Sequence, residues 1–501
     1  MTSWHPQIPE GDGPLYIRLA DRIAEDIATG ALAAGAKLPP QRDLAYDLGV
    51  TVGTIGRAYA VIRQRGLVNG EVGRGTFVLG SAPAAVLEED AKPDLDRKIG
   101  PAAGVPGAPT SSWLQGAMTP PSDTAFAGTR ISVPAPEAVR FDSTSAPEIG
   151  QAEAIRHLSA EITKDAAHEI ASYTRTVPDN WRRAGRLWLA RAGWEPAEGS
   201  IVPTTGAQAA IMAIIAATTS PGDRIAFEEL TYSSISRGAA LTGRRPVQVE
   251  RDDEGPLPED LARVCARQHP KLLFVMPTMH NPTLGLMGEQ RRRDIVSIAR
   301  QHNLWIIEDE VYGSLRETSL PPLAALAPER TFHVGSLSKS VTAGVRGGWV
   351  ASPLSHAQRV YTAHKMLTGG ISFLLSELSA RLVLTGAADG FRLKILDEIA
   401  ARHALVREHL GDYEMNAAPD GPFFWLKLPE PWLSGTFKAA AAAEGVLIDD
   451  EDEFKSGRSE KVYHRIRFGV TNPLTRTETA TGLGILRSLL ADSGACYDSF
   501  E

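Results

Sequence analysis

The sequence predicts a multidomain protein, with a small N-terminal unit of three helices and a β-hairpin followed by an α/β domain that carries a smaller α+β lobe. Three observations support this prediction. The chain has 501 residues, enough for about three folding units. An N-terminal helical periodicity is followed, further along, by helices that alternate with short apolar strands. A segment rich in proline and alanine separates these two patterns.

The N-terminal unit begins with a predicted helix. Pro14 suits a first helical turn, and apolar residues then recur at four-residue spacing until Gly30. Residues 41–48 form a second, shorter helical segment, and Gly49 is placed to break it. Thr51 can then cap a third helix. These two helices form a helix-turn-helix pair.

The third helix has the features of a helix that contacts DNA. Small residues and threonine hydroxyls at its start allow close approach to the major groove, and Arg57 lies one turn further on. Thr51 to Leu79 contains four arginines and one glutamate, a local charge of +3, whereas the whole chain carries −8. Residues 67–79 have strand composition on both sides of a glycine-rich turn, which predicts the hairpin.

These segments resemble the winged helix-turn-helix of the GntR family. The resemblance rests on residues 14–16, 38–45, 48–51 and 65–78. It implies that the unit binds double-stranded operator DNA through Arg42, Thr51, Thr54 and Arg57. It also implies that Arg74 and Gly75, at the tip of the hairpin, enter the minor groove.

The composition changes after residue 80, where the DNA-binding domain of residues 1–80 is expected to end. Residues 81–140 contain nine prolines and twelve alanines, so we expect a semi-rigid linker over residues 81–138. The remaining residues, 139–501, are expected to form a large lobe over about 196–370 and a smaller lobe from 139–195 and 371–501. The expected strands of a largely parallel sheet are 224–227, 246–249, 272–276, 304–307, 331–334 and 347–351.

Reactive side chains follow several of these predicted strands. Lys339 lies on a loop after the strand at 331–334, at the sheet edge where α/β domains bind ligands. Asp309 ends another strand, and Tyr312 follows it. A lysine that forms a Schiff base and a carboxylate that keeps a pyridine nitrogen protonated are what pyridoxal 5′-phosphate requires. In that site Tyr312 and Asn281 would hydrogen-bond the 3′-oxygen, and Tyr232 could stack on the ring.

Donors for the phosphate of this cofactor are also present. Gly206-Ala207-Gln208 opens an alanine-rich helix, whose backbone N–H groups suit a phosphate. Ser336 and Ser338 supply hydroxyl groups beside the lysine, and Arg346 can add a fixed positive charge. The sequence therefore predicts a complete phosphate site.

In their order and spacing, these motifs resemble those of fold-type I aminotransferases. The resemblance implies the corresponding α/β transferase fold. It also implies that Arg467, with Asn281, binds the α-carboxylate of a substrate or effector, and Arg465 is the competing assignment. Tyr173 would contact the phosphate bound by a partner subunit, although Pro178 stands where the family has glycine.

The two resemblances together are typical of MocR-type (GabR-type) regulators. They imply a homodimeric transcription regulator that senses an amino compound, or pyridoxal phosphate itself, through a Schiff base at Lys339. The alternative is an active aminotransferase with an appended DNA-binding unit, in which Lys339, Asp309 and Tyr312 would be catalytic. The acidic strand end at Asp309-Glu310 is more like that of a plain aminotransferase than that of most regulators of this type. A regulator with residual aminotransferase activity is therefore also compatible with the sequence.

Composition excludes several other classes of protein. A net charge of −8 argues against a protein that binds nucleic acid over its whole surface. We find no run of eighteen apolar residues and no signal peptide, so we expect a cytoplasmic protein without a membrane partner. Two cysteines, Cys265 and Cys496, cannot form a disulfide framework or a multi-cysteine zinc site, and we expect no metal.

Overall fold

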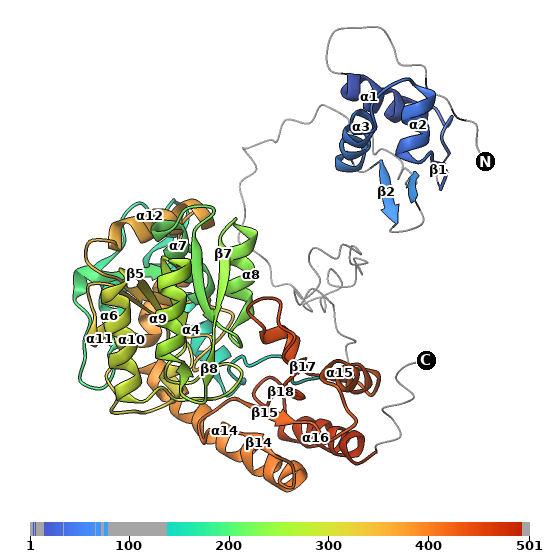
Figure 1. Cartoon of the computed structure of the whole chain (residues 1–501). Helices are drawn as coiled ribbons and strands as arrows, with labels where there is room; N and C mark the ends of the chain where they lie inside the picture. The colour runs from blue at the N-terminus through green and yellow to red at the C-terminus, as the bar shows by residue number, and fades with distance from the viewer. Residues whose placement is uncertain are drawn as a thin grey trace, which may run out of the picture. The chain divides into compact units, whose positions relative to one another are not determined.

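A computed structural model describes residues 4, 6, 15–33, 35–65, 67–71, 75–78 and 138–492 (Figure 1). These residues fall into two compact units, one within Met1–Ala117 and the other within Met118–Glu501. Within the described ranges, every helix is either too short or too polar to cross a lipid bilayer.

The N-terminal unit is a three-helix module with a small antiparallel sheet. Its elements are α1 (Leu15–Ala28), β1 (Lys37–Leu38), α2 (Gln41–Asp47), α3 (Val52–Gln64), β2 (Val68–Glu71) and β3 (Gly75–Val78). The strand order is β1-β3-β2. Leu19 and Ile23 of α1 are fully buried with Ile55 and Ile62 of α3, because both helices carry apolar residues at helical spacing. This arrangement confirms the predicted winged helix-turn-helix.

The turn between α2 and α3 has the expected local chemistry. Gly49 adopts a φ of +65°, a left-handed conformation in which glycine is favoured. Thr51 is the N-cap of α3, and its Oγ1 accepts a hydrogen bond from the Thr54 backbone N–H at 3.2 Å. Both predictions for this turn are confirmed.

The second unit is built on a seven-stranded sheet. Its strands are β5 (Ile201–Thr204), β6 (Arg224–Glu228), β7 (Arg245–Val249), β10 (Leu272–Val275), β11 (Trp305–Asp309), β12 (Thr331–Ser336) and β13 (Gly348–Ala351). They lie in the order β5-β13-β12-β11-β10-β6-β7. β13 is antiparallel to both of its neighbours, and the other adjacent pairs are parallel. The largely parallel sheet predicted for this domain is therefore confirmed.

The edge strand β5 was missing from the predicted set. It contains Pro203, which lacks a backbone N–H and therefore argues against a central strand. In the structure Pro203 lies opposite Trp349 of β13, and β5 has this single neighbour in the sheet. A proline is compatible with such an edge position.

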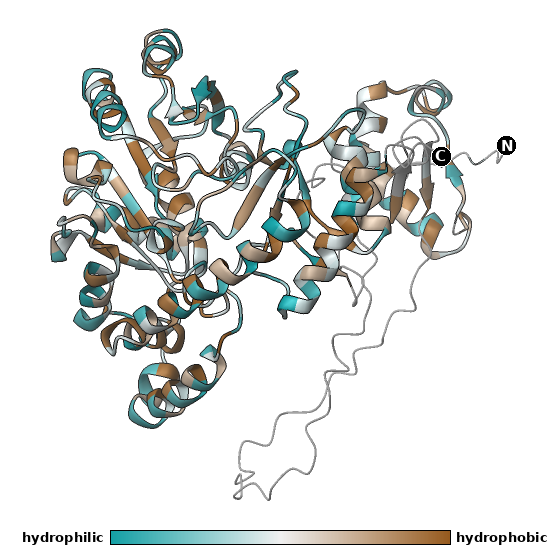
Figure 2. Ribbon diagram, turned by 90° about the horizontal axis from the view of Figure 1, so that it is seen from below, coloured by the Kyte–Doolittle hydropathy of each residue, from teal (hydrophilic) through white to brown (hydrophobic). Residues whose placement is uncertain are grey.

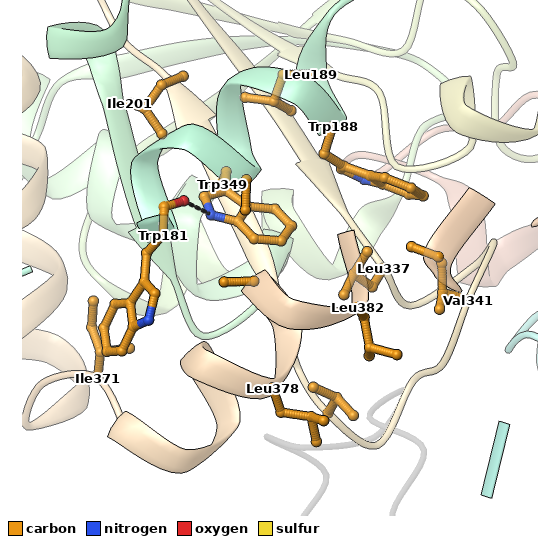
Figure 3. Close-up of a cluster of buried hydrophobic side chains, with 14 of the residues drawn as sticks. Trp181, Trp188, Leu189, Ile201, Leu337, Val341, Trp349, Ile371, Leu378 and Leu382 are labelled. Atoms are coloured by element: carbon orange, nitrogen blue, oxygen red, sulfur yellow. Dashed lines mark hydrogen bonds between the residues drawn. The ribbon is translucent and has the colours of Figure 1, made fainter. Parts of the chain in front are cut away.

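Hydrophobic residues concentrate on the strands and on the faces of the covering helices that point toward them (Figure 2). A large cluster joins α4 (Gln151–Asp165), α6 (Asp179–Leu189) and α13 (Phe373–Leu384) to β13. Trp181, Trp188 and Trp349 are buried within it (Figure 3), and Trp349 Nε1 donates to the Trp181 carbonyl at 2.9 Å. These three helices therefore pack with the large sheet, whereas we expected their residues in the smaller lobe. The buried side chains that these helices contribute, including two tryptophans of α6 and aliphatic residues of α4 and α13, form one apolar cluster with β13.

The smaller lobe has a four-stranded antiparallel sheet. Its strands are β14 (Met415–Asn416), β15 (Phe423–Lys427), β17 (Asp449–Asp450) and β18 (Arg465–Gly469), in the order β14-β15-β18-β17. The helices of this lobe are α14 (Ala387–Leu410), α15 (Ser434–Ala443) and α16 (Arg476–Ala491). β4 (Val139–Arg140) pairs with β16 (Val446–Leu447), so the first described strand of this unit is anchored in the smaller lobe.

Candidate functional site

Lys339 takes part in a chain of polar contacts that joins three distant segments through Thr144. Its Nζ donates to Thr144 Oγ1 at 3.0 Å, and Thr144 Oγ1 is 2.7 Å from the hydroxyl of Tyr312. The ammonium group also lies 5.6 Å from the centroid of the Tyr312 ring. The structure thus brings together Lys339 and Tyr312, as expected, and adds Thr144, which no sequence motif identified.

Asp309 is buried at the carboxyl end of β11. The pKa of Asp309 is raised to about 7, mainly by burial and in smaller part by the charge of Glu310, whereas the Val311 N–H and the charge of Lys339 act in the opposite direction. A positive charge beside Asp309 would therefore favour its carboxylate form. Because strand side chains alternate between faces, Glu308 and Glu310 point to the face opposite that of Asp309.

Asn281 and Arg467 meet across the two lobes. Arg467 Nη1 donates to Asn281 Oδ1 at 2.9 Å, and both side chains are buried, with exposed fractions of 3% for the arginine and 2% for the asparagine. Arg465, the competing arginine, instead contacts Glu414 Oε1 at 2.7 Å and Asn416 Oδ1 at 3.0 Å. Of the two arginines, Arg467 is the one joined to Asn281.

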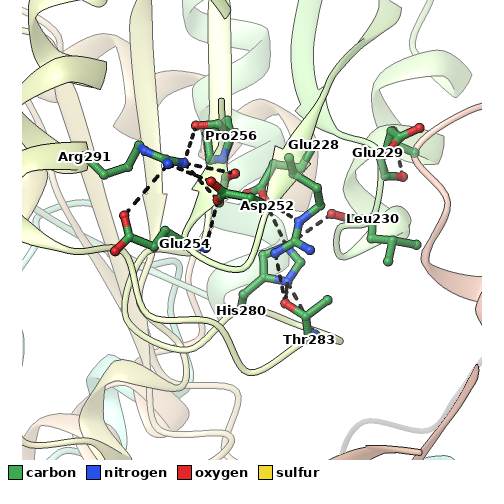
Figure 4. Close-up of polar contacts among 12 residues, drawn as sticks. Glu228, Glu229, Leu230, Asp252, Glu254, Pro256, His280, Thr283 and Arg291 are labelled. Atoms are coloured by element: carbon green, nitrogen blue, oxygen red, sulfur yellow. Dashed lines mark hydrogen bonds and ion pairs between the residues drawn. The ribbon is translucent and has the colours of Figure 1, made fainter. Parts of the chain in front are cut away.

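The loop that carries Asn281 is held by a buried polar network (Figure 4). His280 Nδ1 lies 2.8 Å from Thr283 Oγ1, and its Nε2 lies 3.1 Å from the Leu230 carbonyl. Arg251 connects the same loop to β6, contacting Thr283 Oγ1 and Glu228 Oε2 at 3.0 Å each. Burial and then the charge of Arg251 hold the pKa of His280 well below its ordinary value. A neutral histidine therefore positions the loop next to Asn281.

The N-terminus of α7 (Ala207–Thr218) is fixed against its surroundings. Gly206 precedes it with a φ of +96°, and a Cβ added to Gly348 would lie 2.9 Å from Gly206 Cα. The Thr205 N–H donates to His364 Nε2 at 3.1 Å, and burial lowers the pKa of His364 to about 4. His364 is therefore a neutral acceptor that orients the segment before Ala207 and Gln208. Sequence motifs did not identify it.

The other residues expected at the phosphate lie around this helix start. Thr205 and Arg346 line one cavity of about 240 Å³. Arg346 is exposed and has a φ of +56°. The Ser338 N–H donates to Ser336 Oγ at 3.2 Å, so the two serines stabilise the turn that leads to the lysine. The lining of this cavity thus combines one cation, Arg346, with five hydroxyl-bearing residues: Thr204, Thr205, Ser372, Ser376 and Ser379.

The two further tyrosines occupy different environments. Tyr173 is 86% exposed and lines a cavity of about 500 Å³ with Arg175, Lys365 and Gly369. Tyr232 is half-buried and is the N-cap of α8 (Ser233–Leu241). Tyr173 is thus turned to solvent in the single chain, whereas Tyr232 packs partly into the core beside α7.

Of the predicted DNA-contacting residues, Thr51 and Arg57 lie on an exposed part of the N-terminal unit. The hydroxyls of Thr51 and Thr54 are 2.9 Å apart. The Arg57 guanidinium lies 5.8 Å from the centroid of the Tyr16 ring. Arg42 is in α2 with its side chain outside the described residues, Arg74 lies outside them, and Gly75 begins β3.

Two family descriptions match the chain. Residues 148–474 match the family "Aminotransferase class I and II", and residues 15–78 match "Bacterial regulatory proteins, gntR family". The two matches fall in the two compact units. They agree with the two resemblances identified from the sequence.

Similar full-length proteins are transcriptional regulators. The HTH-type transcriptional regulator YdeF of Bacillus subtilis is 31% identical over 98% of this chain and 97% of its own length. TauR of Rhodobacter capsulatus, also an HTH-type regulator, is 25% identical over 93% of this chain and 95% of its own length. The pyridoxine biosynthesis regulator PdxR of Corynebacterium glutamicum is 25% identical over 79% of this chain and 78% of its own length.

Similar solved structures are aminotransferases. LysN, an α-aminoadipate aminotransferase of Thermus thermophilus complexed with N-(5′-phosphopyridoxyl)-L-leucine, has a TM-score of 0.63 and 21% identity, covering 71% of this chain and 92% of its own. An archaeal alanine:glyoxylate aminotransferase has a TM-score of 0.65 and 22% identity, and the match covers 71% of this chain and 91% of that one. At these identities the likeness shows the shared fold.

Proposed function

Since the chain belongs to the class I and II aminotransferase family and carries a GntR-type DNA-binding unit, the architecture of MocR-type transcriptional regulators, we propose that it controls transcription in response to a small amino compound or to pyridoxal phosphate. The observation that carries this proposal is the contact of Lys339, Thr144 and Tyr312 at the edge of the sheet. A reactive amine in that position gives the regulator a place at which a small molecule can act.

The cofactor of this family, pyridoxal 5′-phosphate, fits the residues present. Asp309 is a buried carboxyl whose pKa is raised to about 7 by burial, so a protonated ring nitrogen beside it would restore its charge. Thr205 and Arg346 share the cavity next to the N-terminus of α7, where backbone N–H groups favour a phosphate. In this proposal Gly206, Ala207, Gln208, Ser336 and Ser338 complete the phosphate contacts. The bound cofactor would supply an aldehyde that reacts reversibly with amines and a ring that withdraws electrons.

The protein side chains would divide the remaining work. Lys339 Nζ is proposed to hold the cofactor through its aldehyde group, which is also the group with which the amino group of an effector would react. Tyr312 and Asn281 would orient the ring through its 3′-oxygen, with Tyr232 against its face. Arg467, joined to Asn281, would contact the substituents of the effector. Movement of the smaller lobe, which carries Arg467, would then change the placement of the DNA-binding units and thereby their affinity for operator DNA.

A homodimer is part of this proposal. Tyr173 is exposed beside a cavity that also contains Arg175 and Lys365, which suits an anionic group held by a second subunit. Two N-terminal units would then bind two half-sites of operator DNA through Arg42, Thr51, Thr54 and Arg57, with Arg74 and Gly75 at the minor groove.

An active aminotransferase is a second candidate function. Lys339, Asp309 and Tyr312 are all present, and Lys339 and Tyr312 meet at Thr144, so the groups needed for proton transfer are retained. Under this alternative the DNA-binding unit regulates little. Sustained turnover of an amino donor with a keto acid, at rates typical of enzymes, would favour the alternative.

A footprint of the full-length protein on the DNA upstream of its own gene tests the regulatory proposal. We expect protection of two half-sites, and a change in protection or affinity when pyridoxal phosphate or amino acids are added. Protection that is identical with and without every small molecule would contradict sensing. The absence of any protected sequence would contradict regulation at this site.

A further inference from the structure

Arg467 lies in a closed cluster where the two lobes meet, which we call the Arg467 cluster, formed with Asp449, Phe423 and Phe454 of the smaller lobe and Asn281 of the large lobe. Its Nε donates to Asp449 Oδ2 at 3.1 Å, and its Nη2 contacts the same oxygen. The two rings lie 5.4 Å and 4.8 Å from the guanidinium carbon, measured to their centroids. The arginine is therefore surrounded by acceptors at its edges and by aromatic rings.

Both edges of the guanidinium that could bind a carboxylate in bidentate fashion are in use. Asp449 occupies the edge formed by Nε and Nη2. At the other edge, Nη1 donates to Asn281 Oδ1 at 2.9 Å and Nη2 to the Asp142 carbonyl at 3.3 Å. A ligand carboxylate would have to displace one of these acceptors, and it would be placed near the negative charge of Asp449.

The strands hold Asp449 in this place. Asp449 of β17 lies directly opposite Arg467 of β18 in the antiparallel register. The side chains of both residues are only 3% exposed, so neither charge is screened effectively by water. Asp450, the next residue, instead contacts Lys438 Nζ at 3.3 Å. The pair of Asp449 and Arg467 is thus a fixed, electrically neutral unit.

We propose that Asp449 determines the specificity of the effector site: by neutralising Arg467, it makes the site favour a primary amine that lacks a carboxylate on its amino-bearing carbon. This inference rests on the proposed function, because it assumes that an amino compound reacts at Lys339. Arg467 then serves to hold Asn281 and to line the site with a neutral pair. The expected ligand class is an alkylamine rather than an α-amino acid.

The experiment compares two probes that differ in this carboxylate alone. Ethylamine and alanine, the latter in both enantiomers, are small enough to enter any site that accepts an amine at Lys339. Dissociation constants are obtained by titrating the full-length, cofactor-loaded protein and following its visible absorbance. For the wild type we expect ethylamine to bind at least as tightly as either enantiomer of alanine, when both are corrected for the fraction of unprotonated amine.

The substitution Asp449→Asn is the main test. It keeps the shape and a hydrogen-bond acceptor but removes the negative charge, so Arg467 becomes free to attract a carboxylate. We expect the affinity for alanine to rise about 10-fold to 100-fold, because a charge-assisted hydrogen bond contributes about that factor, and the affinity for ethylamine to change little. The double variant Asp449→Asn/Arg467→Gln should return the ratio toward that of the wild type.

Asp450→Asn is the matched control, since this neighbouring aspartate contacts Lys438 and not Arg467. It should leave the ratio of the two affinities unchanged. If Asp449→Asn fails to fold, the wild-type ratio still decides, because alanine binding more than about tenfold tighter than ethylamine would overturn the inference.

The two levels of the proposal can fail separately. If both probes change the absorbance but Asp449→Asn leaves their ratio unaltered, the specificity inference is wrong and amino-compound sensing stands. If neither probe changes the absorbance of the wild type or the variant, the proposed sensing of amino compounds is wrong, and this inference falls with it.

Discussion

The start of α3 and the Arg467 cluster use charge in opposite ways. Thr51 and Arg57 are exposed on the N-terminal unit, where an arginine needs no fixed partner. Arg467 is buried and contacts acceptors at both of its edges. An exposed cation suits a large polyanion, which it can attract through solvent. A buried cation suits a small ligand, but each charge there must be balanced in advance. Substitution of Arg57 should therefore affect DNA binding alone, whereas substitutions in the Arg467 cluster should affect both ligand binding and folding.

The largest effect is expected in the buried site, for Lys339→Ala. This variant removes the amine proposed to bond the cofactor, so the visible absorbance of the protein should disappear after dialysis. Lys427→Ala is the control, because Lys427 is a surface lysine paired with Glu414 at 2.8 Å. Absorbance spectra of the dialysed proteins provide the measurement. Retained colour in Lys339→Ala would refute the assignment.

Asp309→Asn probes the energetic consequence of burial. In the cofactor-free protein the pKa of Asp309 is about 7, against an ordinary value of 3.8, because burial disfavours the carboxylate. Between these values the folded chain retains a proton that the unfolded chain has released, so this group lowers stability as the pH rises. From pH 5 to pH 8 the loss should amount to about 3 kcal/mol.

Asp309→Asn should not lose this stability between pH 5 and pH 8, because asparagine does not ionise. Urea unfolding of both cofactor-free proteins at pH 5 and pH 8 measures it, and Asp309→Asn should be the more stable protein at pH 8. An equal response of wild type and variant to pH would show that Asp309 ionises normally in the folded state. The affinity of Asp309→Asn for the cofactor should be lower than that of the wild type, since the asparagine cannot balance a protonated ring nitrogen.

A smaller effect is expected at the exposed surface, for Arg57→Ala. Loss of one arginine contact to DNA typically costs about 1–3 kcal/mol, so operator affinity should fall about 5-fold to 150-fold. The cofactor spectrum should not change, because Arg57 and Lys339 lie in separate units. Arg156→Ala, an exposed helical arginine of the second unit, is the control. Fluorescence anisotropy with the upstream DNA measures the affinity, and equal values for both variants would argue against α3 as the recognition helix.

The smallest effect is expected for Thr51→Ala. Loss of the N-cap bond to the Thr54 N–H should destabilise the first turn of α3 by about 1 kcal/mol. Hydrogen exchange of the amides at the start of α3 should therefore become about fivefold faster. Thr163→Ala provides the comparison, since that hydroxyl bonds carbonyls within α4 and caps nothing. Unchanged exchange in Thr51→Ala would mean that packing alone fixes this turn.

How far the sequence could predict the structure depends on whether a feature is set by neighbouring residues or by distant ones. The cap at Thr51, the break at Gly49 and the start of α7 after Gly206 depend on neighbouring residues, and all three were predictable. Lys339 and Tyr312 were recognisable because each follows an apolar strand at the edge where ligands bind. Their contact could be anticipated from the parallel order of the strands.

Partners that come from distant segments were not predictable. Thr144 precedes Lys339 by 195 positions, and no local motif marks it. His364 contacts Thr205 across 159 positions from the middle of a helix. Asp449 stands in the acidic run from Asp449 to Glu453, a pattern that usually indicates a solvated surface. In each case the pairing arises from the tertiary fold, which a local pattern does not contain.

The two consecutive aspartates of β17 also bear on how this site can change in evolution. Side chains of a strand alternate between faces, and a deletion of one residue before β17 would bring Asp450 opposite Arg467 and Glu451 to the position that Asp450 now holds. An acidic side chain would then still face Arg467, and another would still point toward Lys438. An insertion of one residue would instead bring Ile448 opposite Arg467 and remove the pair. The neutral pair therefore tolerates shortening of the preceding segment but not lengthening, and point substitution of Asp449 is the simpler route to a different ligand preference.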